Sequence, residues 1–150
     1  LNHTLGNYCC ALGILMKSSH EIEKVLFTVY PQTEKRFSIL EVDKTSLKMV
    51  SRVHREDLRP GNTVSGPSMF TLADCAMYAL VLGAYEEQVQ AVTTNVSIDF
   101  LRRPIMNELI AHARILKKGS RLVFGTVLIK SDGIDVAHAS LTYALDTPSQ

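Results

Sequence analysis

The chain has 150 residues, of which 46% are hydrophobic and 21% charged, a balance typical of folded globular proteins rather than disordered ones. This length predicts a single domain that buries roughly two-thirds of the surface of its unfolded chain. Sixteen basic against fifteen acidic residues give a formal net charge of +1. Such a charge excludes a general attraction to nucleic acid or to an acidic membrane and leaves anion binding to local basic clusters.

The three cysteines, Cys9, Cys10 and Cys75, do not form the pattern of a disulfide framework, because two are adjacent and the third lies in an apolar stretch. This usage favours a reducing compartment, and we expect a cytoplasmic protein. The five histidines are scattered without a metal-ligand spacing, so no metal site is predicted.

The chain opens with a short apolar stretch, residues 8–16, that has no basic region before it. It is far shorter than the ~20 residues of a membrane span and is a poor match to a signal peptide. We therefore treat residues 1–17 as an N-terminal arm without an assigned structure, and residues 18–150 as one domain with no membrane-spanning segment.

The first half of this domain predicts one helix and one hairpin. A capping box at Ser18 starts a helix that runs to about Tyr30, where the following proline ends it. Alternating apolar residues over 37–53 then predict two strands joined by a tight turn. Residues 55–65 are interrupted by proline, glycine and asparagine and are expected to form a loop.

The second half predicts a long helix over residues 67–82 followed by a sheet. The helix is apolar on nearly every side, which indicates burial. Short turns separate the strands, so they are expected to pair mainly antiparallel, giving an α+β architecture in which an antiparallel sheet wraps a long central buried helix. The predicted strands cover residues 89–101, 108–116, 122–130 and 135–145.

Asp74 is the one charged residue between Arg59 and Glu86, and it lies within the long apolar helix. An ionised carboxylate removed from water costs several kcal/mol unless it is paired or hydrogen-bonded. An apolar residue would serve folding better at this position. Asp74 is therefore a candidate for acyl-transfer or hydrolytic chemistry, with a structural acid bonded to a hydroxyl or an amide as the alternative.

Several short motifs accompany this acid. Gly66 is followed eight residues later by Leu72-Ala73-Asp74. The others are Val92-Thr93-Thr94-Asn95, Phe100-Leu101-Arg102-Arg103-Pro104, Lys118-Gly119-Ser120-Arg121, and Asp132-Gly133 before Val136-Ala137-His138-Ala139. In this order and spacing they resemble the hotdog-fold thioesterase superfamily, specifically the phenylacetyl-CoA and hydroxybenzoyl-CoA thioesterase type, over about residues 21–145.

The resemblance implies an acyl-CoA thioesterase that acts on a small or medium acyl- or aryl-CoA. Asp74 would be the base or nucleophile, and the backbone N–H of Gly66 would bind the thioester oxygen. Thr93 would orient water or the carboxylate, although a plain strand role fits it too. No cofactor is implied, because coenzyme A arrives as part of the substrate.

The resemblance also implies the lining of the substrate site around Gly66. Ser65 stands where the family has a histidine, and Pro67 where it has a second glycine, so Pro67 offers no second N–H. Arg59 falls at the place of a family asparagine, with Asn62 close by. We expect Asn62, Ser65 and Pro67 to contact the substrate, with helix capping as the alternative role of Ser65.

Basic residues gather in two predicted turns of the second half. As a group they could meet the phosphates of coenzyme A, whereas each one taken singly is better explained as a solvated turn charge. The residues of this group are Arg102, Arg103, Lys117, Lys118 and Arg121.

The spacing of Gly66 and Asp74 predicts an oligomer. Eight residues span about 12 Å along a helix, so both residues cannot reach one thioester carbonyl within the same chain. We therefore expect a homodimer, or a dimer of dimers, with two equivalent composite sites.

Two other functions remain open from the sequence. A non-catalytic acyl-CoA binding or sensing protein is favoured by Arg59, Ser65 and Pro67. A hotdog dehydratase or hydratase would ordinarily need a histidine beside the acid, and none occurs between His54 and His112.

Overall fold

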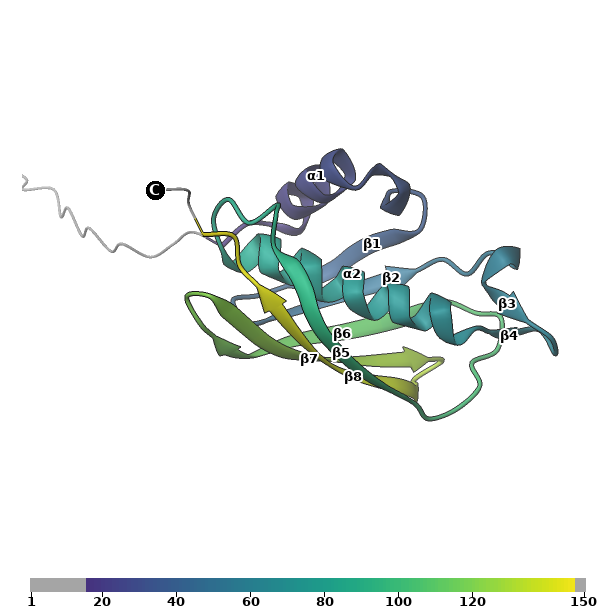
Figure 1. Ribbon diagram of the computed structural model, residues 1–150. Helices are drawn as coiled ribbons and strands as arrows, with labels where there is room; N and C mark the ends of the chain where they lie inside the picture. The colour runs from purple at the N-terminus through teal and green to yellow at the C-terminus, as the bar shows by residue number, and fades with distance from the viewer. Residues whose placement is uncertain (1–15, 148–150) are drawn as a thin grey trace, which may run out of the picture.

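The computed structural model describes residues 16–147 and shows an antiparallel sheet that curves around a long helix (Figure 1). This is the predicted α+β architecture. Residues 1–15 of the expected N-terminal arm lie outside the described residues. The six strands of the main sheet follow the order β1-β2-β6-β7-β8-β5. They are β1 (Phe37–Val42), β2 (Ser46–Ser51), β5 (Val92–Phe100), β6 (Leu109–Lys118), β7 (Leu122–Ser131) and β8 (Ile134–Ala144).

The two α-helices pack on the same side of the sheet, and α1 (Ser19–Val29) contacts both α2 (Gly66–Ala84) and β1. The predicted capping box is present and is formed by Ser18 and Glu21. The helix that continues from it buries one face. By length and composition α2 could cross a membrane, with a mean hydropathy of 1.3, but 67% of that stretch is buried inside the fold. Burial on nearly every side is the environment that its sequence predicted.

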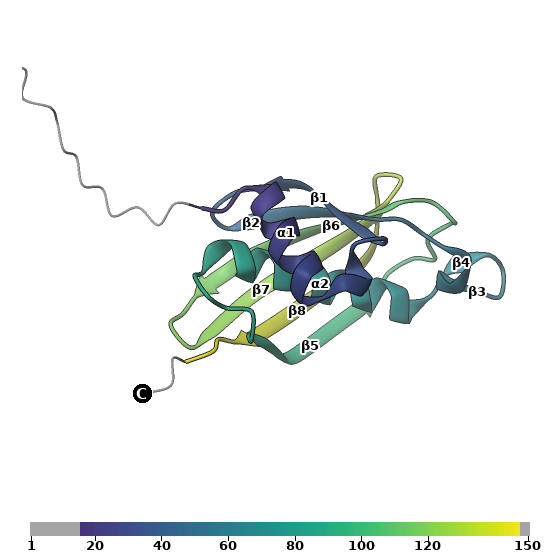
Figure 2. The same ribbon diagram turned by 90° about the horizontal axis from the view of Figure 1, so that it is seen from above.

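Contact between α2 and the middle of the sheet depends on a glycine. A Cβ atom on Gly125 of β7 would lie 1.6 Å from the terminal methyl of Met77 on α2. The same atom would lie 2.5 Å from the Arg114 carbonyl oxygen, a backbone atom that cannot swing aside as the methionine tip can, so only glycine fits where Met77 packs on the sheet. Figure 2 shows α2 lying across the strands.

Two segments differ from the sequence prediction. Residues 55–65 are not a simple loop: they form a short 3-10 helix, η2 (Arg55–Asp57), and a two-stranded ribbon of β3 (Leu58–Arg59) and β4 (Thr63–Val64). Lys117 and Lys118 do not lie in a turn, because they continue β6 and pair with residues of β7. Strand pairing extends further here than the local turn signal indicated.

The two edges of the sheet are unlike. On the β1 edge, the backbone N–H of Ile39 donates to a carboxylate oxygen of Glu23 on α1 (2.7 Å), and a register shift interrupts the strand. On the opposite edge, β5 has no further strand beside it among the described residues (Figure 2). Large apolar side chains at both ends of β5 are exposed, Val92 by 56% and Phe100 by 51%. An exposed, partly apolar edge strand is a surface suited to pairing with another chain.

Candidate active site

The Asp74 carboxylate is held by two hydroxyl groups on the sheet. The Thr93 hydroxyl donates a hydrogen bond to Oδ1 of Asp74 at 2.6 Å. The Tyr143 hydroxyl lies 2.6 Å from the same oxygen and 2.9 Å from the Asp74 backbone carbonyl. The acid in the apolar helix is therefore hydrogen-bonded, and it is only partly buried rather than removed from water.

The strand pairing explains why these two hydroxyls meet. Thr93 of β5 and Tyr143 of β8 are direct partners in the antiparallel register, so their side chains lie on the same face of the sheet. That face is the one covered by α2, and Tyr143 is only 2% exposed. Asp74 of α2 therefore contacts two hydroxyl groups that strand pairing places side by side on the sheet.

The Asp74 carboxylate opens onto a cavity of about 620 Å³. Its walls combine apolar and aromatic side chains with a nearly equal share of polar surface, and Asp74 is the one carboxylate or basic side chain among them. The Tyr78 ring stacks on Tyr143 with centroids 6.4 Å apart. The cavity is lined by Val29, Tyr30, Phe70, Thr71, Asp74, Cys75, Tyr78, Val89, Gln90, Ala91, Val92, Thr93 and Tyr143.

The groups next to Asp74 stay protonated. Burial, and then the neighbouring Asp74 charge, raise the pKa of the Cys75 thiol to about 12. Burial, the Asp74 charge and the hydrogen bond to Asp74 raise the pKa of the Tyr143 hydroxyl well above its usual range. Cys75 is therefore a poor nucleophile, since the thiolate is the reactive form, and Tyr143 remains a hydrogen-bond donor at every working pH.

Gly66 lies on a second, separate cavity of about 400 Å³ at the start of α2. As the first helical residue it has a backbone N–H without a partner inside the helix. A Cβ atom at Gly66 would lie 3.2 Å from the Phe100 ring, so the glycine keeps this cavity open. Three arginines line the same cavity, Arg59, Arg102 and Arg103. It shares no lining residue with the Asp74 cavity.

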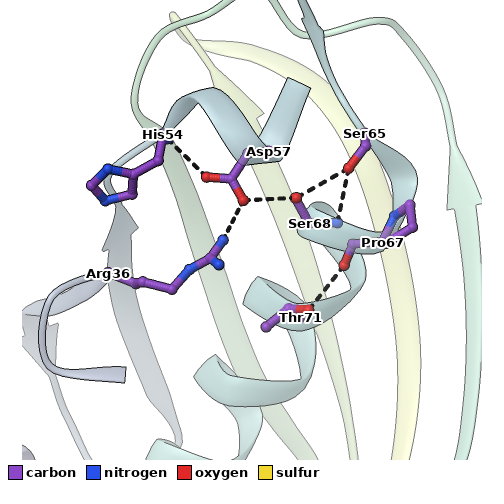
Figure 3. Close-up of polar contacts among 7 residues, drawn as sticks. All are labelled: Arg36, His54, Asp57, Ser65, Pro67, Ser68 and Thr71. Carbon is purple, nitrogen blue, oxygen red and sulfur yellow. Dashed lines mark hydrogen bonds and ion pairs between the residues drawn. The ribbon is translucent and has the colours of Figure 1, made fainter. Parts of the chain in front are cut away.

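The start of α2 is fixed by a buried acid, Asp57, which is 3% exposed (Figure 3). One carboxylate oxygen accepts hydrogen bonds from the Ser68 hydroxyl (2.8 Å) and the Arg36 guanidinium. The other oxygen accepts the His54 backbone N–H (2.8 Å). The Asp57 backbone carbonyl in turn accepts the N–H of Ser65 (2.8 Å). Asp57 therefore anchors the residues on both sides of Gly66.

The charge state of Asp57 follows from these contacts. Burial disfavours its ionised form, but the hydrogen bonds from His54, Ser68 and Arg36 outweigh burial and hold its pKa below the ordinary value of 3.8. A carboxylate that stays ionised is a firm anchor for the N–H and hydroxyl donors around it.

The residues predicted around Gly66 have separate positions. Ser65 is the N-cap of α2, since its hydroxyl accepts the Ser68 N–H at 3.4 Å, which is the alternative role foreseen for it. Pro67 occupies the first turn, where a missing N–H is tolerated. Asn62 lies in the β3–β4 turn with φ of 56° and does not line the Gly66 cavity.

The predicted basic group is divided between two ends of α2. Arg102 and Arg103 line the Gly66 cavity, and Arg102 also donates to the Asp135 carbonyl at 2.8 Å. At the other end, Lys118 donates to the carbonyl of Ala84 at 2.7 Å and lies 4.7 Å from the Tyr85 ring centroid. Lys118 thereby satisfies a carbonyl at the C-terminus of α2. Lys117 lies near the end of β6 and Arg121 directly before β7, so both are close to the turn that joins these strands.

Asp57 and Tyr143 were not found from the sequence. Asp57 follows two other charged residues, and its partner Arg36 is 21 residues away in the chain. Tyr143 carried a usable signal: in the alternating pattern of β8 it falls on the buried side, where a tyrosine hydroxyl needs a partner. Its partner comes from α2, 69 residues earlier. Within residues 16–147 no group of three or more His, Cys, Asp or Glu side chains could hold a metal ion.

The fold and the hydroxyl-bonded acid define the class: a hotdog protein with a carboxylate at the wall of a partly apolar cavity. The family model of the thioesterase superfamily matches residues 61–138. A proposed thioesterase of Silicibacter sp. is 39% identical, with a TM-score of 0.78 over 88% of this chain and 96% of that one. The chain therefore belongs to the thioesterase superfamily, as its motifs predicted, and is a thioester hydrolase.

More distant solved structures share the fold. A proposed thioesterase of Ralstonia eutropha, related to phenylacetic acid degradation, is 22% identical, with a TM-score of 0.77 over 86% of this chain and 100% of that one. A hypothetical thioesterase of Streptococcus pneumoniae, solved with coenzyme A, is 18% identical, with a TM-score of 0.73 over 85% and 98%. No curated protein matches the sequence.

Proposed function

We propose that this protein hydrolyses acyl-CoA thioesters of small or medium acyl or aryl groups, with Asp74 as the reacting carboxylate and the Gly66 N–H as the oxyanion donor. The observation that carries the proposal is the Asp74 carboxylate, bonded to Thr93 and Tyr143 at the wall of a cavity that also presents apolar and aromatic side chains. The apolar part of this cavity suits an acyl group, and coenzyme A bound to the Streptococcus pneumoniae protein supports the choice of thiol.

The reaction needs a base or nucleophile and an oxyanion donor. Asp74 either takes a proton from water as the water oxygen attacks the thioester carbonyl carbon, or attacks that carbon itself to form an anhydride that water then cleaves. In both routes the carbonyl oxygen gains negative charge next to the Gly66 N–H at the positive end of α2. The C–S bond then breaks, and the thiolate leaves and takes up a proton. No cofactor of the protein's own takes part in the proposal.

A composite site follows from the positions of the two cavities along β5. The Asp74 cavity includes Val92 and Thr93 at the start of β5, and the Gly66 cavity includes Phe100 at its end. When two copies of β5 pair antiparallel about a two-fold axis, the start of one strand lies beside the end of the other. Asp74 of one subunit then approaches Gly66 of its partner, and the dimer holds two equivalent sites. Dimers of this kind could pair again into a tetramer.

The same pairing gathers basic side chains for the phosphates of coenzyme A. Val92 and Leu122 both pair with Ala144, so the β6–β7 turn that carries Arg121 lies near the start of β5. In the proposed dimer this turn comes toward Arg103 of the partner subunit. We assign phosphate binding to Arg102, Arg103 and Arg121, and a structural role to Lys118 because its ammonium is already engaged. The cysteine usage supports a reducing, cytoplasmic location.

Thiol release from a panel of short-chain, medium-chain and aromatic acyl-CoAs tests the function. We expect turnover of at least one member and release of equal amounts of acid and thiol. Binding of acyl-CoA without turnover would instead indicate a sensing protein, the function that Pro67, with its missing N–H, favours. Hydration of an enoyl-CoA would indicate a hydratase, although no histidine lines the Asp74 cavity within the described residues.

A further inference from the structure

The two oxygens of the Asp74 carboxylate have different surroundings. Oδ1 accepts the Thr93 hydroxyl and the Tyr143 hydroxyl, both at 2.6 Å. Oδ2 accepts no hydrogen bond from any residue in the described part of the chain. An oxygen that already accepts two short hydrogen bonds is a weaker base than one with free lone pairs. The carboxylate therefore presents one occupied and one available oxygen.

We infer that Tyr143 is a positioning residue for the hydrolytic reaction: it holds Asp74 through Oδ1, so that Oδ2 meets the attacking water or the thioester carbonyl. This inference rests on the function proposed above and extends the site to a residue of β8. The Tyr143 ring is itself fixed, because it is 2% exposed and stacks on Tyr78. Its hydroxyl also lies 2.9 Å from the Asp74 backbone carbonyl. The one hydroxyl therefore contacts both the backbone and the side chain of Asp74.

The chemistry of Tyr143 suits a positioning role rather than proton transfer. Burial and the Asp74 charge raise the pKa of its hydroxyl far above its usual range, so it gives up no proton during turnover. A hydroxyl that keeps its proton can donate to the carboxylate beside it throughout turnover, so Tyr143 orients Asp74 and takes no part in moving protons.

Tyr143→Phe tests the inference, because it removes the hydroxyl and keeps the ring against Tyr78. We expect kcat to fall by about ten- to a hundred-fold, the range associated with a misplaced reacting group, with a much smaller change in KM. This split between kcat and KM is the readout that a merely structural role of Tyr143 would not produce.

Tyr85→Phe is the matched control. The Tyr85 hydroxyl donates to the Gly119 carbonyl at 2.7 Å, so this variant also loses one tyrosine hydrogen bond to the protein, but outside both cavities. We expect it to melt earlier than the native protein and to keep the native kcat and KM. A Tyr143→Phe variant that behaves like this control would overturn the inference.

The inference and the proposed function fail in different ways. If the native protein and Asp74→Asn release thiol equally fast, the proposed function is wrong whatever Tyr143 does. If Asp74→Asn is inactive while Tyr143→Phe keeps the native kcat, Asp74 is catalytic and Tyr143 merely fills the core. A fall in the kcat of Tyr143→Phe with little change in KM, together with an inactive Asp74→Asn, supports both.

Discussion

Gly66 and Asp74 lie eight residues apart on α2 and line two cavities that share no residue. The helix separates them by about 12 Å, and no rotation of side chains within one chain can close that distance. In the proposed mechanism each cavity supplies one half of the site: one has an N–H without a partner inside the helix, and the other has a carboxylate at its wall. The exposed β5 edge supplies the surface on which two copies can join these halves.

Subunit mixing tests the composite site. Asp74→Asn and Gly66→Pro, which removes the N–H while suiting the first helical position, should each be inactive alone. In hybrid dimers one of the two sites combines the intact Gly66 of one subunit with the intact Asp74 of the other. With random assortment of the two kinds of subunit, we expect about a quarter of native activity to return. Recovery would be measured as thiol release after co-refolding, and a mixture as inactive as its components would contradict a shared site.

Thr93 should share in positioning Asp74. Thr93→Val keeps the shape of the β-branched side chain and removes the donor to Oδ1, so we expect kcat to fall with little change in KM. Thr93→Ser keeps the hydroxyl and should retain most of the native kcat. Equal activity of the two variants would assign Thr93 a strand role alone. Steady-state kinetics of both variants would distinguish these outcomes.

The Asp57 anchor predicts an acid-dependent loss of stability. The pKa of Asp57 is lower in the folded protein than its ordinary value of 3.8, so its ionised form stabilises the fold above that pH. This contribution is lost as pH falls through the lowered folded-state pKa. Asp57→Asn should cost about 3 kcal/mol of unfolding free energy at neutral pH, because it leaves Arg36 without its charge partner. The difference from the native protein should shrink on acidification, as urea unfolding at several pH values would show. A difference that stays constant down to pH 2 would contradict this assignment.

Arg103 and Lys118 should respond differently to substitution by methionine. Arg103→Met should raise KM for an acyl-CoA several-fold but leave KM for the matching N-acetylcysteamine thioester unchanged, because that substrate has no phosphates. Lys118→Met should leave both KM values unchanged and lower the unfolding free energy by about 1 kcal/mol, through the lost hydrogen bond to the Ala84 carbonyl. A phosphate-dependent KM effect at Lys118 would return it to the substrate-binding group.

The sequence was sufficient for the elements that depend on local pattern. The apolar run around Asp74 predicted a buried helix, and the turn signals separated the strands of the sheet. Lys117 and Lys118 were misplaced in a turn because strand length is set by pairing with β7, which the local signal does not contain. The pairing of Thr93 with Tyr143, and of Asp57 with Arg36, joins residues far apart in the chain. Such contacts depend on strand register and tertiary packing, so single-sequence patterns do not reveal them.

The most direct test of the central claim is thiol release by the native protein and by Asp74→Asn on the best acyl-CoA of the panel. Asparagine keeps the size of the side chain and removes its capacity to act as base or nucleophile. We predict that turnover falls by at least about a thousand-fold, since no other group in the cavity replaces the carboxylate. Equal turnover by both proteins would contradict the account and place the chemistry elsewhere.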